Sequence, residues 1–547
     1  MGGALESDRT ICDNCVEWIS SRDVVAKTRE GAVTLSDDRH QELQSVSHAA
    51  VSSAASPTLD DLFRRTFLRR PEAVALIDPP NKQRVGAQTP ARLTYAEADR
   101  AISGIAKQFI EAGLPPGSIV AFQLPNIIEF PIALLAAIRA GMTVALLPQL
   151  WRQSELTAAL TRIGARALVG IGRIELVDHG DLAMNAAAEV FSIRHVFGFG
   201  KHLPDGMAQL DIAAHARAEF DSPPKLDPRQ PAIVTFDVTA DDLCAVPRNH
   251  IQLIAGGLAV MLESGMPSEA NILSTVTPNS FGTFASSIMP WLLSGRALTL
   301  HHPGDLQVLE QQIAGPHHDV LVTPAPLALR LAEAQALSGR ASLSHVIGLW
   351  RTPERVSSSE QWRDSKVSFT DVLLFGEIGL VAAQRLNDGS PAPINAGVQC
   401  APRAVPGSRA VGEVALTPKG TLALRGVMVP VSSYHRTAQS GVSLSETPQQ
   451  ADTGYSARMN RNTNMIEITS PPGGIFAVGG YRFLSKDLEE WSKRLGSDAM
   501  LAALPDQLNG YRLAGRALDI GRVREALGEL GLNPLMVDAF RNRAGPA

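Results

Sequence analysis

The chain has 547 residues, of which 45% are hydrophobic and 19% are charged, and its formal net charge at pH 7 is −5. This composition is typical of a globular protein, and the acidic balance argues against a nucleic-acid binder, which usually carries a basic face. The longest apolar runs, 130–138 and 251–262, are shorter than the roughly 18–20 residues of a membrane-spanning helix, so we expect no membrane span.

Residues 1–56 are polar and rich in serine, and we expect a disordered tail. The segment lacks a basic region followed by an apolar stretch, so it predicts no signal peptide and a cytoplasmic protein. Cys12 and Cys15 form one C-x-x-C pair, whereas a structural zinc site needs four ligands. His40 and His48 are spaced too widely to complete such a site. We interpret the two cysteines as thiols of the tail and leave their role open.

The first ordered elements alternate between helix and strand. Thr94 and Glu97 have the spacing of a capping box, and apolar residues at helical spacing follow them up to Gly113. The next segments predict, in turn, strand, helix, strand, helix and strand: 118–124, 129–141, 142–148, 153–165 and 167–172. Strands that alternate with helices predict a mainly parallel sheet that is covered on both faces.

A second α/β block follows, and the chain changes character after about residue 400. The block comprises five segments: 272–278, 289–303, 319–334, 344–354 and 372–383. Residues 411–426 predict a pair of hairpin strands. The sequence S-P-P-G-G at 470–474 is typical of a hinge, and a short terminal block begins after it.

This order of elements resembles the adenylate-forming superfamily, which contains acyl-CoA synthetases, adenylation domains and luciferases. The resemblance covers roughly residues 57–547 and is strongest in 93–148, in G-E-V-A-L at 412–416 and in V-G-G-Y-R-F at 478–483. It implies an α/β fold: a large, multi-subdomain N-terminal adenylation-type domain over 57–470 and a small, shortened α+β C-terminal domain over 471–547. Members join a carboxylate to AMP, using ATP and magnesium, and then usually pass the acyl group to a thiol.

The phosphate loop of the family has the pattern F-T-S-G-T-T-G-x-P-K-G-V, which aligns without gaps with residues 235–246. Thr239 keeps its type, but Val238 and Asp241 replace the two glycines and Cys244 replaces the lysine. Acidic side chains stand where pyrophosphate would bind: Asp237, Asp241 and Asp242. One carboxylate about 4 Å from a phosphate charge costs roughly 4 kcal/mol at an effective dielectric of 20. The resemblance therefore implies a vestigial phosphate loop.

The adenine and metal signature of the family, Y-G-x-T-E, aligns with F-G-E-I-G. Phe375 can replace the aromatic residue that packs on adenine, and Gly376 is retained. The threonine is lost and the spacing is shortened, which leaves Glu377 as the candidate metal carboxylate. The alternative interpretation of Glu377 is an ordinary glutamate at the end of a strand.

The ribose signature, T-G-D, is also altered. Thr453 and Gly454 remain, but Tyr455 replaces the carboxylate that would hold two ribose hydroxyls. Arg458 matches a common family position, and a surface arginine is the simpler interpretation.

The terminal block retains Gly479 and Gly480, but it has Ala477 where the family has a lysine. The catalytic lysine of P-K-T-x-x-G-K has no counterpart, because the chain contains no lysine after Lys493. Arg541 or Arg543 could supply a positive charge, and we assign no catalytic residue.

These losses predict an acyl-CoA-synthetase-like protein that does not adenylate and needs no cofactor. It would bind an acyl group, CoA, an acyl carrier protein or an intact ligase paralogue. The alternative is an active AMP-forming ligase with a divergent site that uses ATP and Mg²⁺.

Overall fold

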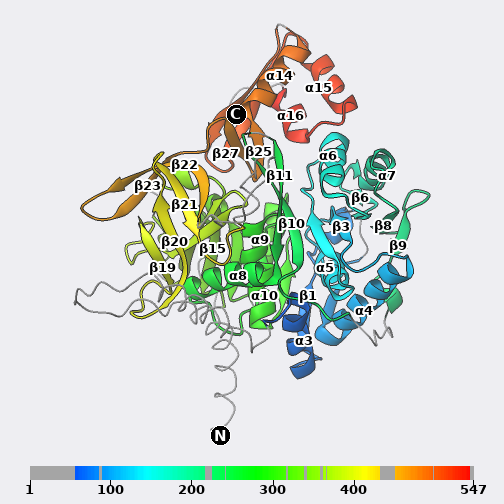
Figure 1. Cartoon of the computed structure of the whole chain (residues 1–547), viewed down its shortest axis with the longest axis horizontal. Helices are drawn as coiled ribbons and strands as arrows, with labels where there is room; N and C mark the ends of the chain where they lie inside the picture. Colours follow the sequence, from blue (N-terminus) through cyan, green and yellow to red (C-terminus); the bar gives the residue numbers. More distant parts are fainter. Residues whose placement is uncertain are drawn as a thin grey trace, which may run out of the picture.

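The computed structural model describes residues 56–541 apart from 86–88, 216–223, 241, 316–317, 338–341, 358–360, 365, 431–449 and 497 (Figure 1). Cys12, Cys15, Asp241 and Arg543 lie outside the described residues, as does all of the predicted tail except residue 56. No helix in the described part of the chain is long and apolar enough to cross a membrane.

A seven-stranded sheet holds the first α/β block, in the order β11-β10-β4-β3-β5-β8-β9. Its strands are β3 (Ile119–Phe122), β4 (Thr143–Leu146), β5 (Ala167–Ile171), β8 (His195–Phe199), β9 (Ala208–Leu210), β10 (Pro231–Val238) and β11 (Leu243–Asn249). All neighbours pair in parallel except β10 and β11. The associated helices are α4 (Tyr95–Glu111), α5 (Glu129–Arg139), α6 (Gln153–Ile163) and α7 (His179–Glu189). The alternation predicted from the sequence is confirmed, and Thr94 and Glu97 form the capping box.

An eight-stranded sheet holds the second block, in the order β17-β16-β15-β14-β12-β13-β1-β2, with β17 and β2 as its antiparallel edges. Its strands are β1 (Val74–Ile77), β2 (Arg92–Thr94), β12 (Ile272–Ser274), β13 (Leu298–Leu300), β14 (Val320–Pro324), β15 (His345–Trp350), β16 (Ser368–Phe375) and β17 (Gly379–Gln384). The associated helices are α3 (Leu59–Arg69), α8 (His250–Ser264), α9 (Phe281–Ser286), α10 (Ile288–Ser294), α11 (Leu306–Ala314) and α12 (Ala325–Glu333).

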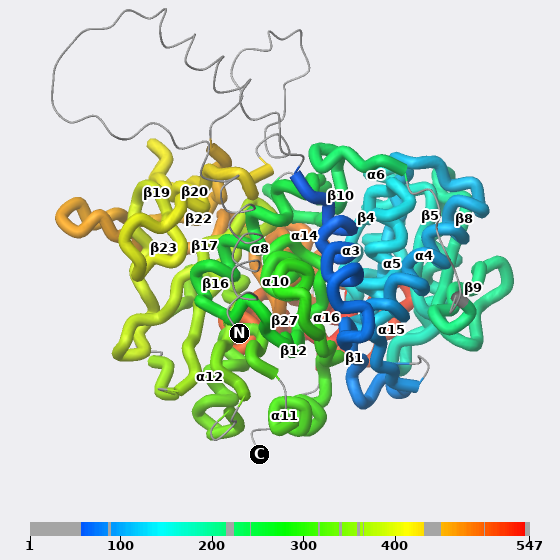
Figure 2. The backbone as a smooth tube through the Cα atoms, turned by 90° about the horizontal axis from the view of Figure 1, so that it is seen from below, coloured from blue at the N-terminus to red at the C-terminus, as the bar shows by residue number. Residues whose placement is uncertain are grey.

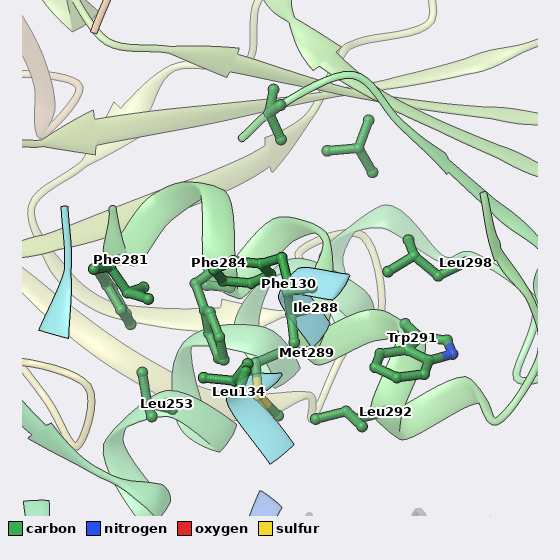
Figure 3. Packing of buried hydrophobic residues seen from close by; sticks show 14 of the residues in the cluster. Phe130, Leu134, Leu253, Phe281, Phe284, Ile288, Met289, Trp291, Leu292 and Leu298 are labelled. Carbon is green, nitrogen blue, oxygen red and sulfur yellow. The ribbon is translucent and has the colours of Figure 1, made fainter. Parts of the chain in front are cut away.

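Helix α8 is buried on nearly every side, as expected of a helix that is apolar all round. It lies with α10 in the middle of the molecule, between the blue and cyan half and the yellow half (Figure 2). Side chains of α9 and α10 pack tightly around it, among them Phe281 and Met289 (Figure 3). A Cβ atom on Gly256 or Gly257 would overlap these two side chains, so small residues of α8 allow the close packing.

A six-stranded antiparallel sheet follows, in the order β18-β23-β22-β21-β20-β19. Its strands are β18 (Ile394–Asn395), β19 (Gly397–Ala401), β20 (Arg409–Leu416), β21 (Thr421–Arg425), β22 (Ala451–Asn460) and β23 (Met465–Ser470). The hairpin predicted at 411–426 is confirmed as β20 and β21. Shorter elements elsewhere are β6 (Arg173–Ile174), β7 (Val177–Asp178), η1 (Lys82–Val85), η2 (Ala213–His215) and η3 (Pro353–Arg355).

The last described residues, 475–541, form a separate small α+β unit, which we call the C-terminal block. It contains β24 (Ile475–Val478), β25 (Tyr481–Leu484), β26 (Met500–Asp506), β27 (Gly510–Arg516), α14 (Ser485–Leu495), α15 (Ile520–Glu529) and α16 (Pro534–Ala539). Its own apolar core includes Leu488, Leu501, Leu527 and Phe540. The block stands at one end of the molecule, above β11 and next to α6 (Figure 1).

Candidate functional site

The residues aligned with the phosphate loop form a tight β-hairpin. Strands β10 and β11 pair antiparallel as far as Asp237 with Cys244 and Val238 with Leu243. Next to this pair, the backbone N–H and the hydroxyl of Thr239 both donate to the carbonyl of Asp242 at 3.0 Å. Strand pairing therefore directs backbone groups toward the neighbouring strand, whereas a phosphate-binding nest turns successive N–H groups toward the anion.

Asp237 is buried and ion-paired with an arginine of the C-terminal block. The distance from Arg482 Nη1 to Asp237 Oδ1 is 2.8 Å. The backbone N–H of Glu377 donates to Oδ2 of the same aspartate at 3.0 Å. Arg482 Nη2 also donates to the hydroxyl of Tyr455 at 3.0 Å. One guanidinium thus joins the phosphate-loop position to the ribose position, and we call this contact the Asp237–Arg482–Tyr455 bridge.

The adenine-side residues lie against this bridge. Phe375 is fully buried and meets Tyr455 edge to face, with ring centroids 5.4 Å apart. Gly376 has φ +59°, and a Cβ atom there would lie 2.5 Å from Arg482 Nη1 and 2.6 Å from Asp237 Oδ2. Burial raises the pKa of Tyr455 to about 12, so its hydroxyl is neutral. The predicted adenine and ribose residues are brought together: Phe375 contacts Tyr455, and Gly376 lies against Asp237 and Arg482.

Glu377, the candidate metal carboxylate, is held by protein groups. Its carboxylate accepts the backbone N–H of Phe281 at 2.8 Å and lies 3.9 Å from Arg248 Nη1. Arg248 is itself buried, stacks over the Phe281 ring at 3.9 Å and donates to the carbonyl of Glu377. Among the described residues, no group of three or more His, Cys, Asp or Glu side chains could hold a metal ion. The metal role of Glu377 stays a prediction.

Burial also raises the pKa of Glu377 to about 7; the charge of Arg248 opposes this shift and Asp237 adds to it. Because this pKa lies above its ordinary value of 4.5, the associated stability is fully present below pH 4.5 and is lost as pH rises through about 7. Glu377→Gln should therefore match the wild type at pH 4, and at pH 8 its free energy of unfolding should be about 3 kcal/mol higher than that of the wild type. Urea unfolding at both pH values measures this, with the exposed Glu111→Gln as control. An equal pH response in wild type and Glu377→Gln would contradict the prediction.

The remaining ribose-side residues have structural contacts. The Thr453 hydroxyl donates to the carbonyl of Leu422 at 2.6 Å, and Gly454 has φ +73° beside Pro472. Arg458 is exposed on β22, in register with Glu467. Its position agrees with the surface interpretation.

Two arginines that were not predicted from the sequence make central polar contacts at the site: Arg482 and Arg351. Arg351 Nη1 donates to the carbonyl of Gly479 at 2.7 Å, and a Cβ atom on Gly480 would overlap the Arg351 guanidinium. Gly479 and Gly480 both have positive φ, so these glycines let the chain pass over the arginine. The available signals were weak: Arg482 lies within the V-G-G-Y-R-F signature, and Arg351 directly follows a buried strand.

A cavity lies elsewhere, between α8 and the strands β17, β19, β20 and β21. Its volume is about 30 Å³, room for about two water molecules. Glu263 and Arg403 lie on its wall, and none of the residues aligned with the nucleotide signatures lines it.

Residues 63–348, more than half of the chain, match the family described as AMP-binding enzyme. The chain belongs to this family. It is 28% identical over 208 residues to a salicyl-AMP ligase / salicyl-S-ArCP synthetase of Mycobacterium tuberculosis (38% of this chain, 36% of the relative). It is 32% identical over 161 residues to a 2-hydroxy-7-methoxy-5-methyl-1-naphthoate–CoA ligase of Streptomyces carzinostaticus (28% of this chain, 27% of the relative). These matches thus span about a third of the relatives' length.

Solved structures extend the likeness across most of this AMP-binding family member. An artificially fused adenylation–PCP di-domain, NpsA-ThdA from Klebsiella oxytoca, superposes with TM-score 0.63 and 18% identity, over 88% of this chain and 93% of that chain. The apo structure of Mycobacterium smegmatis MbtA gives TM-score 0.62 and 18% identity, over 91% and 92%. At this identity the likeness shows the fold alone. The α/β fold with a large adenylation-type domain is confirmed.

Proposed function

We propose that this member of the AMP-binding family does not form acyl adenylates and acts as a binding protein. The observation that carries the proposal is the Asp237–Arg482–Tyr455 bridge. Asp237 stands in the phosphate-loop position and Tyr455 in the ribose position. Arg482 neutralises Asp237 and donates a hydrogen bond to Tyr455. Both side chains thus have a partner within the protein.

The electrostatics of the bridge support this proposal. Pyrophosphate would have to approach Asp237 and compete for Arg482, a side chain that is already 2.8 Å from that carboxylate. Breaking a buried ion pair by removing one partner costs about 3–5 kcal/mol, because it leaves an uncompensated charge. On this proposal the residues present do not fit a nucleoside triphosphate, and we derive no reaction step through ATP or magnesium.

The second candidate function is an active AMP-forming ligase with a divergent site. Family membership favours it, since the similar proteins of Mycobacterium tuberculosis and Streptomyces carzinostaticus are named as ligases that form AMP or CoA derivatives. In this function Glu377 would hold magnesium. ATP binding would then require Arg482 to leave Asp237 and the Phe281 N–H to leave the Glu377 carboxylate.

The ligands of the proposed binding function are an acyl group, CoA, an acyl carrier protein or an intact ligase paralogue, in the cytoplasm. The names of the similar proteins support the first three, because they refer to CoA ligation and to ArCP loading. Calorimetric titration with CoA and with a holo carrier protein would show which of these two ligands binds with the higher affinity.

Carboxylate-dependent ATP–pyrophosphate exchange tests the proposal. We expect no exchange above the level without protein for a panel of fatty, aromatic and amino acids, and no heat of ATP binding with or without Mg²⁺. A matched variant, Arg482→Ala, removes the bridge and shows whether the bridge alone blocks ATP. A known active family member assayed in parallel controls the reagents. Robust exchange by the wild-type protein would establish the ligase function instead.

A further inference from the structure

Four residues that precede the C-terminal block surround one guanidinium group, and we call them the guanidinium site. They are Asp237 of β10, Glu354 of η3, Gly376 in the turn between β16 and β17, and Tyr455 of β22. The guanidinium belongs to Arg482 of β25, which lies in the C-terminal block. Because the block has its own apolar core, the site and the group that it holds belong to two separately packed parts of the chain.

Glu354 adds a second carboxylate to this site. Both of its carboxylate oxygens are shielded from solvent, and neither has a hydrogen-bond partner among the described residues. Burial raises the pKa of Glu354, and the charges of Arg355 and Arg482 oppose this rise. The charge of Glu354 in turn adds to the effect of burial on the pKa of Tyr455. A shielded carboxylate without a hydrogen bond is unfavourable, so the site has acceptor capacity that no described residue uses.

The geometry of the site suits a guanidinium group better than an ammonium group. Arg482 Nη1 lies 2.8 Å from Asp237 Oδ1, while Nη2 donates to the Tyr455 hydroxyl at 3.0 Å. The planar group packs against Gly376, where a Cβ atom would lie 2.5 Å from Nη1. A guanidinium presents its donors in a fixed fork and can bind both acceptors at once, whereas an ammonium is a compact, strongly hydrated point charge.

The arginine enters the site across a boundary that has other polar contacts. The Tyr481 hydroxyl accepts the backbone N–H of Leu150 at 3.3 Å, and Lys486 Nζ donates to the carbonyl of Ala240 at 3.1 Å. Polar interfaces of this kind within one chain permit relative motion. Arg482 can therefore leave the site without unfolding either part of the chain.

We propose that the guanidinium site binds monosubstituted guanidinium compounds, the class to which free arginine belongs, and that Arg482 occupies it as an internal ligand. This inference goes beyond the proposed function, and its test involves no nucleotide. While the block is docked, the tethered Arg482 competes with a free ligand at high effective concentration. A free ligand therefore enters only when the block moves away or when the Arg482 side chain is removed.

Titration of the full-length Arg482→Ala variant with N-methylguanidinium chloride tests this proposal. Calorimetry and thermal unfolding are the readouts, at no more than about 50 mM salt, where guanidinium salts denature little. We expect saturable binding with a Kd of the order of 1 mM, well within the limit for a ligand of this size. At ten times Kd, the ratio of folded to unfolded protein should rise about elevenfold.

Three controls make the titration specific. Methylammonium chloride carries the same charge without the fork, and it should bind at least about tenfold more weakly. Wild-type protein should show no saturable binding, because Arg482 occupies the site. Adding Asp237→Asn to Arg482→Ala removes the buried charge that pairs with the ligand and should weaken binding at least about tenfold.

A second variant serves if Arg482→Ala does not fold. Arg482→Ala combined with Glu354→Gln has one shielded carboxylate fewer and keeps Asp237, so it should show the same preference for N-methylguanidinium. The proposal is overturned if neither variant binds N-methylguanidinium or if methylammonium binds equally well. It is also overturned if the wild type or the Asp237→Asn double variant binds as tightly as Arg482→Ala. ATP–pyrophosphate exchange tests the proposed function separately, so either proposal can fail alone.

Discussion

Replacement of Arg482 by alanine is expected to lower the free energy of unfolding by about 3 kcal/mol. The variant leaves the Asp237 carboxylate buried without the guanidinium that lies 2.8 Å from it, and it removes the donor to the Tyr455 hydroxyl. Urea unfolding followed by tryptophan fluorescence measures the loss. Hydrogen exchange should show which part of the chain is destabilised: we expect faster exchange in β10 and β25, the strands that contain Asp237 and Arg482.

A matched control is available on the surface of the same block. Arg494 pairs with Glu490 one helical turn away, and both side chains are well exposed. Arg494→Ala should therefore cost no more than about 0.5 kcal/mol. Adding Asp237→Asn to Arg482→Ala should recover part of the loss, because the neutral amide no longer needs the cation. If Arg482→Ala is as mild as Arg494→Ala, the bridge does not hold the site closed.

Lys82→Met should destabilise the N-terminal part of the chain by about 3–5 kcal/mol. Lys82 is buried and its Nζ atom lies 2.7 Å from Asp78 and 2.6 Å from Glu129. Methionine has nearly the same side-chain volume as lysine, but it lacks the ammonium group that pairs with both carboxylates. Like-charge repulsion between the carboxylates then adds to their cost of burial. Thermal and urea unfolding of the purified variant measure the effect.

The control for this variant is Lys107→Met on α4, whose partner Glu111 is 3.9 Å away and mostly exposed. That change should cost less than about 1 kcal/mol. Lys82→Met combined with Glu129→Gln should be more stable than Lys82→Met alone. Near-equal stability of the Lys82 and Lys107 variants would contradict a structural role for the buried cluster.

Local patterns predicted much of the fold. The Thr94–Glu97 capping box, the strand–helix alternation up to residue 172 and the 411–426 hairpin each depend on residues close in sequence, and each is confirmed. The aligned signatures singled out Asp237, Phe375 and Tyr455 one by one, and the structure places all three in contact with one another or with Arg482. Family membership follows from the same framework.

The sequence could not predict which residues the aligned positions contact. Arg482 lies 245 residues from Asp237 along the chain, and no local periodicity links the two positions. The sequence also could not predict that β10 and β11 stay paired as far as Val238. An aligned loop motif gives the residue type at each position but not the register of the flanking strands. The contacts of Arg351 were hidden for the same reason. They are made with Gly479 and Gly480, which lie far from Arg351 in sequence and meet it only in the folded chain.

On the proposed non-adenylating function, the pairing of β10 with β11 constrains which substitutions could restore a phosphate loop. A glycine at 238 would lie in a strand that is already paired with β11, and glycine within a strand weakens it. A lysine at 244 would sit opposite Asp237, which Arg482 already neutralises. On the proposed function, restoring a phosphate loop would therefore need several substitutions together, because the strand pairing and the Asp237–Arg482 pair both stand in its way.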